Sequence, residues 1–185
     1  PVMTREAFSE ISQIAERGKF DAVCLADGNG VRDMHMPALF AANHPSARPS
    51  FFEPTTLLSA VSMVTKKIGV VATATSTFDE PYMVARRFAS MDHISKGRAG
   101  WNLVTSQNVD EARNFSRDRH LGHELRYVRA DEFSVVVAGR WVRWEDATSL
   151  RSLAPRRSIR ASQLHLATPL SNHCQGAGTP PPDHP

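Results

Sequence analysis

The sequence predicts an α/β fold built on a parallel sheet. Three short apolar segments, at residues 20–26, 68–74 and 99–104, are typical of buried strands, and segments with helical apolar spacing separate them. Strands that are apolar on both faces and alternate with helices indicate parallel βα units. Two architectures fit this pattern: a (β/α)8 barrel and a doubly wound open sheet.

Each expected helix carries a start or a stop signal. Thr4 can cap a helix that stops near Gly18. Pro54 and Pro81 each suit the first position of a helix, and Gly97 can end the second of these as a left-handed cap. A long helix follows over about residues 124–144. The positions expected on buried helical faces recur at helical spacing: Phe8, Ile11, Ile14, Ala15, Leu57, Leu58, Val61, Val64, Val84, Phe88, Met91, Ile94, Tyr127, Phe133, Val136, Val137 and Trp141.

Composition excludes several classes of protein. The 185 residues include 22 Lys and Arg against 19 Asp and Glu, and the whole excess of positive charge falls after residue 146, so the body has no basic stripe for nucleic acid. No apolar run is long enough for a membrane span. Cys24 and Cys174 are too few for a disulfide framework, which favours a reducing, cytoplasmic compartment. Cys24 is expected to pack inside its strand.

The chain divides near residue 146. Residues 147–185 contain no aromatic residue and half of the prolines, so they cannot offset their ordering entropy by apolar burial and are expected to be disordered. This tail is either a natural flexible extension or a departure from the reading frame, and the abrupt change favours the second explanation. We therefore expect a domain at residues 1–146 and a low-order tail at residues 147–185.

Polar residues follow the three expected strands, at residues 27–29, 73–77 and 102–106. In both candidate folds, ligands bind at the carboxyl ends of the strands, so this edge is the expected binding site. Asp27 could instead cap a turn, and Thr73 could be ordinary strand filler. His123 and Tyr127 lie at i and i+4 and could face a ligand together, although the spacing alone favours a solvated His beside a core Tyr.

Two familiar motifs are incomplete. Gly28-Asn29-Gly30 follows a strand like a dinucleotide-binding loop, but Asp33 replaces the third Gly. His123-Glu124 begins like a zinc-protease helix, but Tyr127 stands where the second His ligand belongs, so no metal site is expected.

The run from Ala85 to Ser106, ARRFASMDHISKGRAGWNLVTS, closely resembles the bacterial-luciferase-like flavin monooxygenases. Within them it is similar to the branch of the nitrilotriacetate, EDTA and dibenzothiophene-sulfone monooxygenases. The segments AERGKFD at 15–21, LADG at 25–28, FEP at 52–54, EARNF at 111–115 and WED at 144–146 support the resemblance, which covers about residues 5–146.

The resemblance implies a (β/α)8 barrel that binds FMN at the carboxyl ends of its strands. Such enzymes take reduced FMN from a separate flavin reductase and use O2 to oxygenate a small organic substrate, and they are usually homo-oligomers. By the same resemblance, the cofactor-binding residues are Asp27, Thr73, Asn102, His123 and Tyr127. No catalytic residue is assigned.

A complete barrel needs about 250 residues, whereas the resembling region is much shorter. The first barrel strand and four later strands are expected to be absent, which leaves an incomplete barrel with open sheet edges. We therefore expect a truncated monooxygenase that is weakly active or inactive by itself. The alternative is a non-catalytic remnant that binds no ligand.

Overall fold

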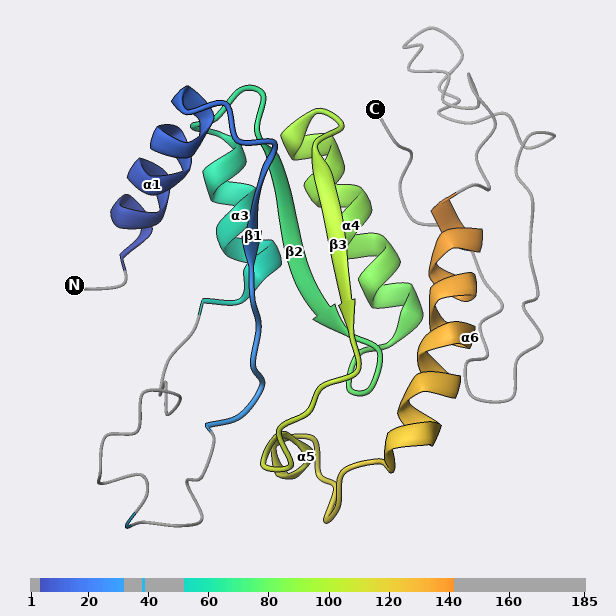
Figure 1. Cartoon of the computed structure of the whole chain (residues 1–185). Helices are drawn as coiled ribbons and strands as arrows, with labels where there is room; N and C mark the ends of the chain where they lie inside the picture. The colour runs from blue at the N-terminus through green and yellow to red at the C-terminus, as the bar shows by residue number, and fades with distance from the viewer. Residues whose placement is uncertain (1–3, 32–37, 39–51, 142–185) are drawn as a thin grey trace, which may run out of the picture.

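The computed structural model describes residues 4–31, 38 and 52–141, and it has an α/β architecture (Figure 1). The elements follow in the order α1 (Arg5–Arg17), β1 (Ala22–Leu25), α3 (Pro54–Ser62), β2 (Gly69–Thr75), α4 (Pro81–Ser95), β3 (Ala99–Val104), α5 (Glu111–Asn114) and α6 (His123–Trp141). The expected tail at residues 147–185 lies outside the described residues.

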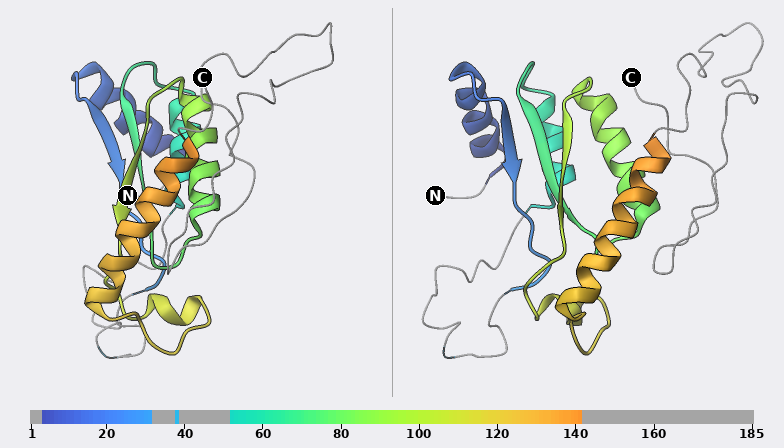
Figure 2. Two further views of the ribbon diagram at one scale, coloured as in Figure 1. Left: turned by 90° about the vertical axis from the view of Figure 1, so that its right-hand side faces the viewer. Right: turned by 45° about the vertical axis from the view of Figure 1, so that its right-hand side comes forward.

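The three strands form a parallel sheet in the order β1-β2-β3. Cys24 pairs with Val71, and Thr73 pairs with Asn102. Helices α3 and α4 cover one face of the sheet, and α6 packs against α4 (Figures 1 and 2). In the described part of the chain, no helix covers the opposite face of the sheet. All three strands end at the same edge, which also carries α5 and the beginning of α6.

The core lies between the sheet and helices α3, α4 and α6. Its buried members come from all four elements: Leu57, Leu58, Val61, Val70, Ala72, Ala74, Val84, Phe88, Met91, Phe133, Val136 and Val137. Trp101 of β3 packs against this core, and its indole N–H donates to the Ala74 carbonyl at 3.2 Å. Since side chains alternate along a strand, residues 71, 73, 100 and 102 point to the uncovered face.

The helix signals in the sequence are confirmed. The Thr4 hydroxyl accepts a hydrogen bond from the Ala7 amide, as an N-cap should. Pro54 and Pro81 begin α3 and α4. Gly97 has a φ of 81°, and its N–H donates to the Asp92 carbonyl, although Lys96 before it also adopts the left-handed conformation.

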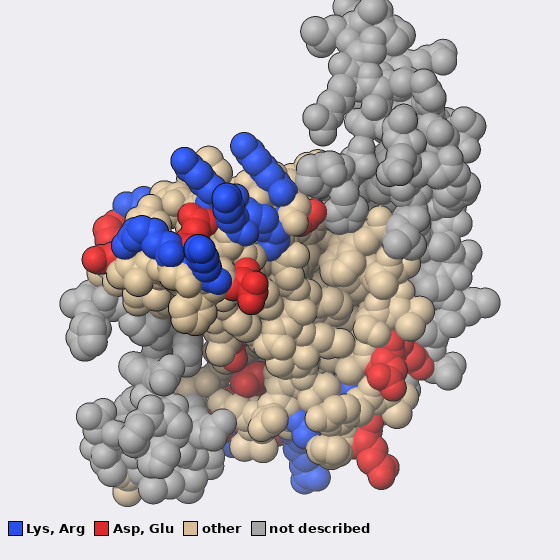
Figure 3. Space-filling view, turned by 45° about the horizontal axis from the view of Figure 1, so that its top comes forward, with Lys and Arg blue, Asp and Glu red and all other residues tan. Residues whose placement is uncertain are grey.

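Two charged side chains join the elements at the amino-terminal edge of the sheet. The Arg98 guanidinium donates to the carbonyl oxygens of Ser62, Thr65, Ile68 and Ser95, and to the Thr65 hydroxyl. The Glu16 carboxylate accepts from the consecutive amides of residues 66–68 at 2.6–3.0 Å. Lys and Arg side chains gather on the surface of this edge (Figure 3).

Several burial predictions are wrong. The first strand is not buried, because β1 is an edge strand of the described sheet and Cys24 is exposed on the uncovered face. Ile11, Ile14 and Ile94 are also exposed, because only the inward side of α1 and α4 meets another element. Val64 is exposed because α3 ends at Ser62, before that residue.

Candidate functional site

The carboxyl edge of the sheet brings together the loops that follow β1, β2 and β3. The Ser76 amide, after β2, donates to the Val104 carbonyl at 2.9 Å, and the Thr77 hydroxyl donates to the Thr105 carbonyl at 2.7 Å. The Ser106 hydroxyl donates to the Thr75 hydroxyl at 2.9 Å. These bonds hold the ends of β2 and β3 in a fixed relation and make this edge a continuous polar rim.

Among the predicted cofactor-binding residues, Thr73 and Asn102 lie on neighbouring strands and contact each other directly. They occupy paired positions of β2 and β3, and Asn102 Nδ2 donates to Thr73 Oγ1 at 2.9 Å. Thr73 is only 3% exposed, whereas Asn102 is exposed. The Asn102 side chain makes no other hydrogen bond to the described residues, so its carbonyl oxygen and its second N–H can face a ligand on the uncovered face of the sheet.

Asp27 lies at the end of β1 and is half-buried. Its Oδ1 accepts from the Gly28 amide at 2.8 Å, which is the turn-stabilising contact that the sequence left open. Burial raises the pKa of Asp27, and the negative charges of Glu53 and Asp79 raise it further, whereas the Gly28 N–H and Arg87 oppose the rise. Asp27 therefore interacts electrostatically with two other carboxylates, those of Glu53 and Asp79.

His123 and Tyr127 lie together on the first turns of α6. Their ring centroids are 4.8 Å apart, so the predicted i, i+4 pair forms. Both side chains are exposed, Tyr127 by 52%, so the alternative of a core Tyr is wrong. The Arg126 guanidinium donates to the Ser106 carbonyl, and Arg129 Nε donates to the Ser76 carbonyl at 2.8 Å. These two arginines tie the start of α6 to the same strand-end rim.

Glu111 and His120 are two residues of this edge that the sequence analysis missed. Glu111 begins α5 and is buried, and His120 precedes α6 with its ring edge against Phe78, at 5.3 Å between centroids. An acid at the start of a short helix normally indicates a solvent-exposed cap, so no sequence signal marked Glu111. Its burial results from packing of α5 on the loop after β1, where Gly30 touches the backbone of Glu111.

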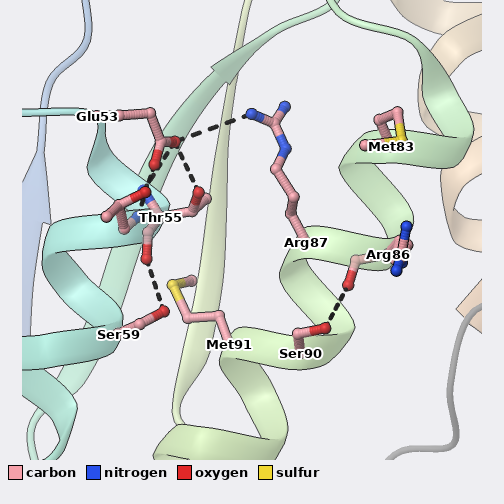
Figure 4. A pocket seen from close by; sticks show the side chains of 9 residues that line it. Glu53, Thr55, Ser59, Met83, Arg86, Arg87, Ser90 and Met91 are labelled. Atoms are coloured by element: carbon pink, nitrogen blue, oxygen red, sulfur yellow. Dashed lines mark hydrogen bonds and ion pairs between the residues drawn. The ribbon is translucent and has the colours of Figure 1, made fainter.

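A groove of about 530 Å³ lies between α3 and α4, on the helical side of the sheet. In Figure 4, Glu53 and Arg87 point toward each other across it, with 3.9 Å between their charged atoms. Burial raises the pKa of Glu53, but hydrogen bonds from Thr55 and Thr56 outweigh burial and lower the pKa below its ordinary value. Arg87 also pairs with Asp79. Arg87 is therefore already paired with two acids, and Asn102 is not among the residues that line the groove.

The sequence pattern of the luciferase-like monooxygenases matches residues 3–161 of the chain. The chain belongs to this family. The match extends past residue 146, where the sequence resemblance was expected to end. The chain is 43% identical over 190 residues to nitrilotriacetate monooxygenase component A of Aminobacter aminovorans, an alignment that covers 96% of this chain and 41% of that protein.

Solved structures of other proteins share the fold. The long-chain alkane monooxygenase LadA superposes with a TM-score of 0.88 at 31% identity, over 97% of this chain and 42% of that chain. A riboflavin lyase, RcaE, crystallised with modified FMN and riboflavin, also superposes with a TM-score of 0.88, at 28% identity, over 98% of this chain and 41% of that chain. The barrel architecture is thus confirmed over the doubly wound sheet, and the chain spans about two fifths of these relatives.

The residues on the uncovered face fit a flavin. Cys24, Val71 and Gly100 form one row across the sheet, and a Cβ on Gly100 would lie 3.0 Å from Val71 Cγ2. Gly100 leaves room for the Val71 side chain in this row. Asn102 lies in the next row toward the carboxyl end, where its amide oxygen and second N–H suit the polar edge of a flavin ring. In the described part of the chain, no cluster of His, Cys, Asp and Glu suits a metal ion, and no helix is long and apolar enough to cross a membrane.

Proposed function

We propose that the chain forms the flavin-facing part of an FMN-dependent monooxygenase. In this proposal it uses reduced FMN and O2 to oxygenate a small organic substrate, as its membership of the luciferase-like family supports. The observation that carries the proposal is the Thr73–Asn102 pair near the carboxyl end of the sheet, in which the exposed Asn102 amide keeps a carbonyl oxygen and a second N–H for a ligand. The bound reduced flavin would supply the electrons and activate O2.

Each candidate residue has a role in the proposal. Asn102 would hydrogen-bond to the polar edge of the flavin ring, and Thr73 would fix the orientation of the Asn102 amide. Asp27 would border the ring from the end of β1. His123 and Tyr127, already in contact with each other, would approach the cofactor from α6. Together these side chains would orient the ring and exclude water from it, which protects oxygen chemistry from side reactions.

A separate flavin reductase is the partner that the proposal requires, since the similar nitrilotriacetate enzyme is named as a component A. We also propose a homo-oligomer in the cytoplasm, where the exposed thiol of Cys24 stays reduced. Across the described residues, β1 and β3 are open sheet edges and the candidate flavin surface faces solvent. Water on that surface would favour release of hydrogen peroxide over oxygenation of the substrate. We therefore expect little activity from this chain alone.

Titration with FMN tests the proposal. The purified chain is added to FMN, and both flavin fluorescence and its anisotropy are recorded, with oxidised and chemically reduced flavin in separate series. A Kd below about 100 μM, which corresponds to a binding free energy of roughly −5.5 kcal/mol, supports the proposal. Fluorescence that does not change at that concentration favours the alternative, a remnant that binds no ligand.

A further inference from the structure

Five exposed basic side chains lie on the amino-terminal edge of the sheet, opposite the candidate flavin site (Figure 3). Each is the last residue of a helix or lies between a helix and the next strand: Arg17, Lys19, Lys66, Lys67 and Lys96. The strands that follow are parallel neighbours in the order β1-β2-β3, and adjacent strands of a sheet are about 4.8 Å apart. The three turns therefore lie side by side and form one surface, which we call the basic edge.

The positive charge of the basic edge results from the placement of its residues. Six Lys and Arg stand against three Asp and Glu in the segments that form it, residues 16–21, 63–68 and 92–98. Residues 1–146 as a whole contain equal numbers of basic and acidic residues. The sequence analysis found no basic stripe because the basic residues come from three separate segments.

Local stabilisation does not explain the lysines of the basic edge. A cation at the end of a helix interacts favourably with the helix dipole, which accounts for Arg17. Lys66 and Lys67, however, follow the end of α3 by four and five positions. Lys19 and Lys96 have φ angles of 60° and 61°, a left-handed conformation that glycine adopts far more readily. A use for the charge, rather than a backbone preference, therefore explains the lysines at these positions.

Large apolar side chains lie among the lysines. Phe20 is 67% exposed and Met63 is 73% exposed, and Val64 and Ile94, in the same segments, are exposed as well. Single exposed apolar side chains are ordinary, but four of them along one edge form a mixed basic and apolar surface. Anionic bilayers bind this combination, because lysines meet the lipid phosphates while apolar side chains enter the interfacial region.

Other partners fit the basic edge less well. Protein interfaces are enriched in Arg and depleted in Lys, whereas four of the five basic side chains here are Lys. Nucleic acid would pair its phosphates with the lysines, but it offers no apolar phase to Met63, Val64 or Ile94. A lipid surface accounts for both kinds of side chain.

The three turns are already joined before any partner binds. The Glu16 carboxylate accepts from the amides of residues 66–68, and Gln13 Nε2 donates to the Val64 carbonyl at 3.0 Å, so α1 is tied to the second turn. The Arg98 guanidinium binds carbonyl oxygens of the second turn and of Ser95, which adds the third turn. A surface that is preorganised in this way loses less entropy on binding.

We propose that the basic edge is a docking surface for an anionic phospholipid bilayer, on which the chain lies without crossing it. The lysines would bind lipid phosphates, and Phe20 and Met63 would enter the interfacial region. The seven residues of β2 separate this edge from the candidate flavin site by about 20 Å, so that site would remain in solution. The cytoplasmic face of a membrane carries the anionic lipids that this surface fits.

Co-sedimentation of the full chain with lipid vesicles tests the proposal. Vesicles of about one third phosphatidylglycerol and two thirds phosphatidylcholine are compared with vesicles of phosphatidylcholine alone, at about 50 mM and about 500 mM NaCl. We expect binding to the anionic vesicles that weakens at the higher salt concentration, and binding to phosphatidylcholine at least about tenfold weaker. Phe20→Ser should lower the partition coefficient about tenfold at both salt concentrations, because salt does not screen apolar burial.

Charge variants locate the binding surface. Each lysine near an anionic bilayer contributes about fivefold to the partition coefficient, so Lys19→Gln, Lys66→Gln and Lys96→Gln together should lower it about a hundredfold. The matched control removes three exposed arginines that lie away from the basic edge and should change the coefficient by less than about twofold, since distant charges are screened. It combines Arg86→Gln, Arg113→Gln and Arg119→Gln.

Equal partition of the triple lysine variant and the wild type would assign binding to other basic residues, such as those after residue 146, and overturns the proposal. Equal binding of the wild type to both kinds of vesicle overturns it as well. A wild type that binds homopolymeric RNA but not anionic vesicles would make the basic edge a nucleic-acid surface instead. Circular dichroism checks folding, and the wild-type series decide the matter if a variant does not fold. The assay contains no flavin, so its result is independent of the proposed monooxygenase function.

Discussion

Asn102→Ala isolates the contribution of the strand-end amide to flavin binding. The Asn102 side chain uses one N–H for Thr73 and keeps its carbonyl oxygen and a second N–H for a ligand. Two ligand hydrogen bonds at about 1 kcal/mol each would be lost, which weakens FMN binding by about 2 kcal/mol, or roughly thirtyfold in Kd. Because the buried Thr73 hydroxyl loses its Asn102 partner, we expect the free energy of unfolding to fall by about 1 kcal/mol, which leaves the variant folded.

Fluorescence titration measures the Kd, and thermal unfolding followed by circular dichroism checks that the variant folds. Gln13→Ala is the matched control, since the Gln13 amide also makes one exposed hydrogen bond, to the Val64 carbonyl, but lies on α1. Its Kd should stay within about twofold of the wild type. A Kd for Asn102→Ala that is equally unaffected, in a folded variant, would refute the assignment of the uncovered sheet face as the flavin surface.

Three further predictions concern the frame around the site. Backbone hydrogen bonds from residues 66–68, the Ile68 N–H foremost, lower the pKa of Glu16 from 4.5 to about 2, so its stabilisation is complete above pH 4.5 and is lost as the pH falls toward 2. Glu16→Gln should therefore flatten the fall of Tm across that interval, and an unchanged Tm profile would contradict this. Arg98→Met removes five hydrogen bonds and should lower the free energy of unfolding by about 3 kcal/mol in urea titrations, whereas a loss below about 1 kcal/mol would show that the network is dispensable. Gly30→Ala forces the Glu111 backbone away and should speed hydrogen exchange across residues 106–116; exchange at the wild-type rate would exclude the close packing.

The regular elements were predictable because local chemistry marks their ends. Thr4, Pro54, Pro81 and Gly97 act through backbone geometry and hydrogen bonds within a few residues, so the sequence alone carries the signal. Exposure was less predictable. Cys24 lies in an apolar segment, yet it is exposed because β1 is an edge strand in the described sheet. The residues of a strand do not indicate where that strand lies in the order of the sheet.

The candidate site was predictable in its place but not in its contacts. Parallel strands end at one edge, so the strand ends after β1, β2 and β3 had to meet there. The bond between Thr73 and Asn102 depends on the register of β2 against β3, which the sequence does not reveal. Glu111 was missed because its burial depends on the contact of α5 with Gly30, a residue 81 positions earlier in the chain.

The most direct test of the central claim, that FMN lies beside Thr73 and Asn102 at the carboxyl edge of the sheet, is the rate of Cys24 alkylation. Cys24 is exposed on the uncovered face of the sheet, in the row next to Thr73 and Asn102. In a Cys174→Ser background, iodoacetamide labelling followed by mass spectrometry reports this thiol alone. With FMN at about ten times its Kd, the account predicts labelling about tenfold slower than without flavin. Labelling at the same rate in flavin-saturated protein would place the cofactor elsewhere and contradict the account.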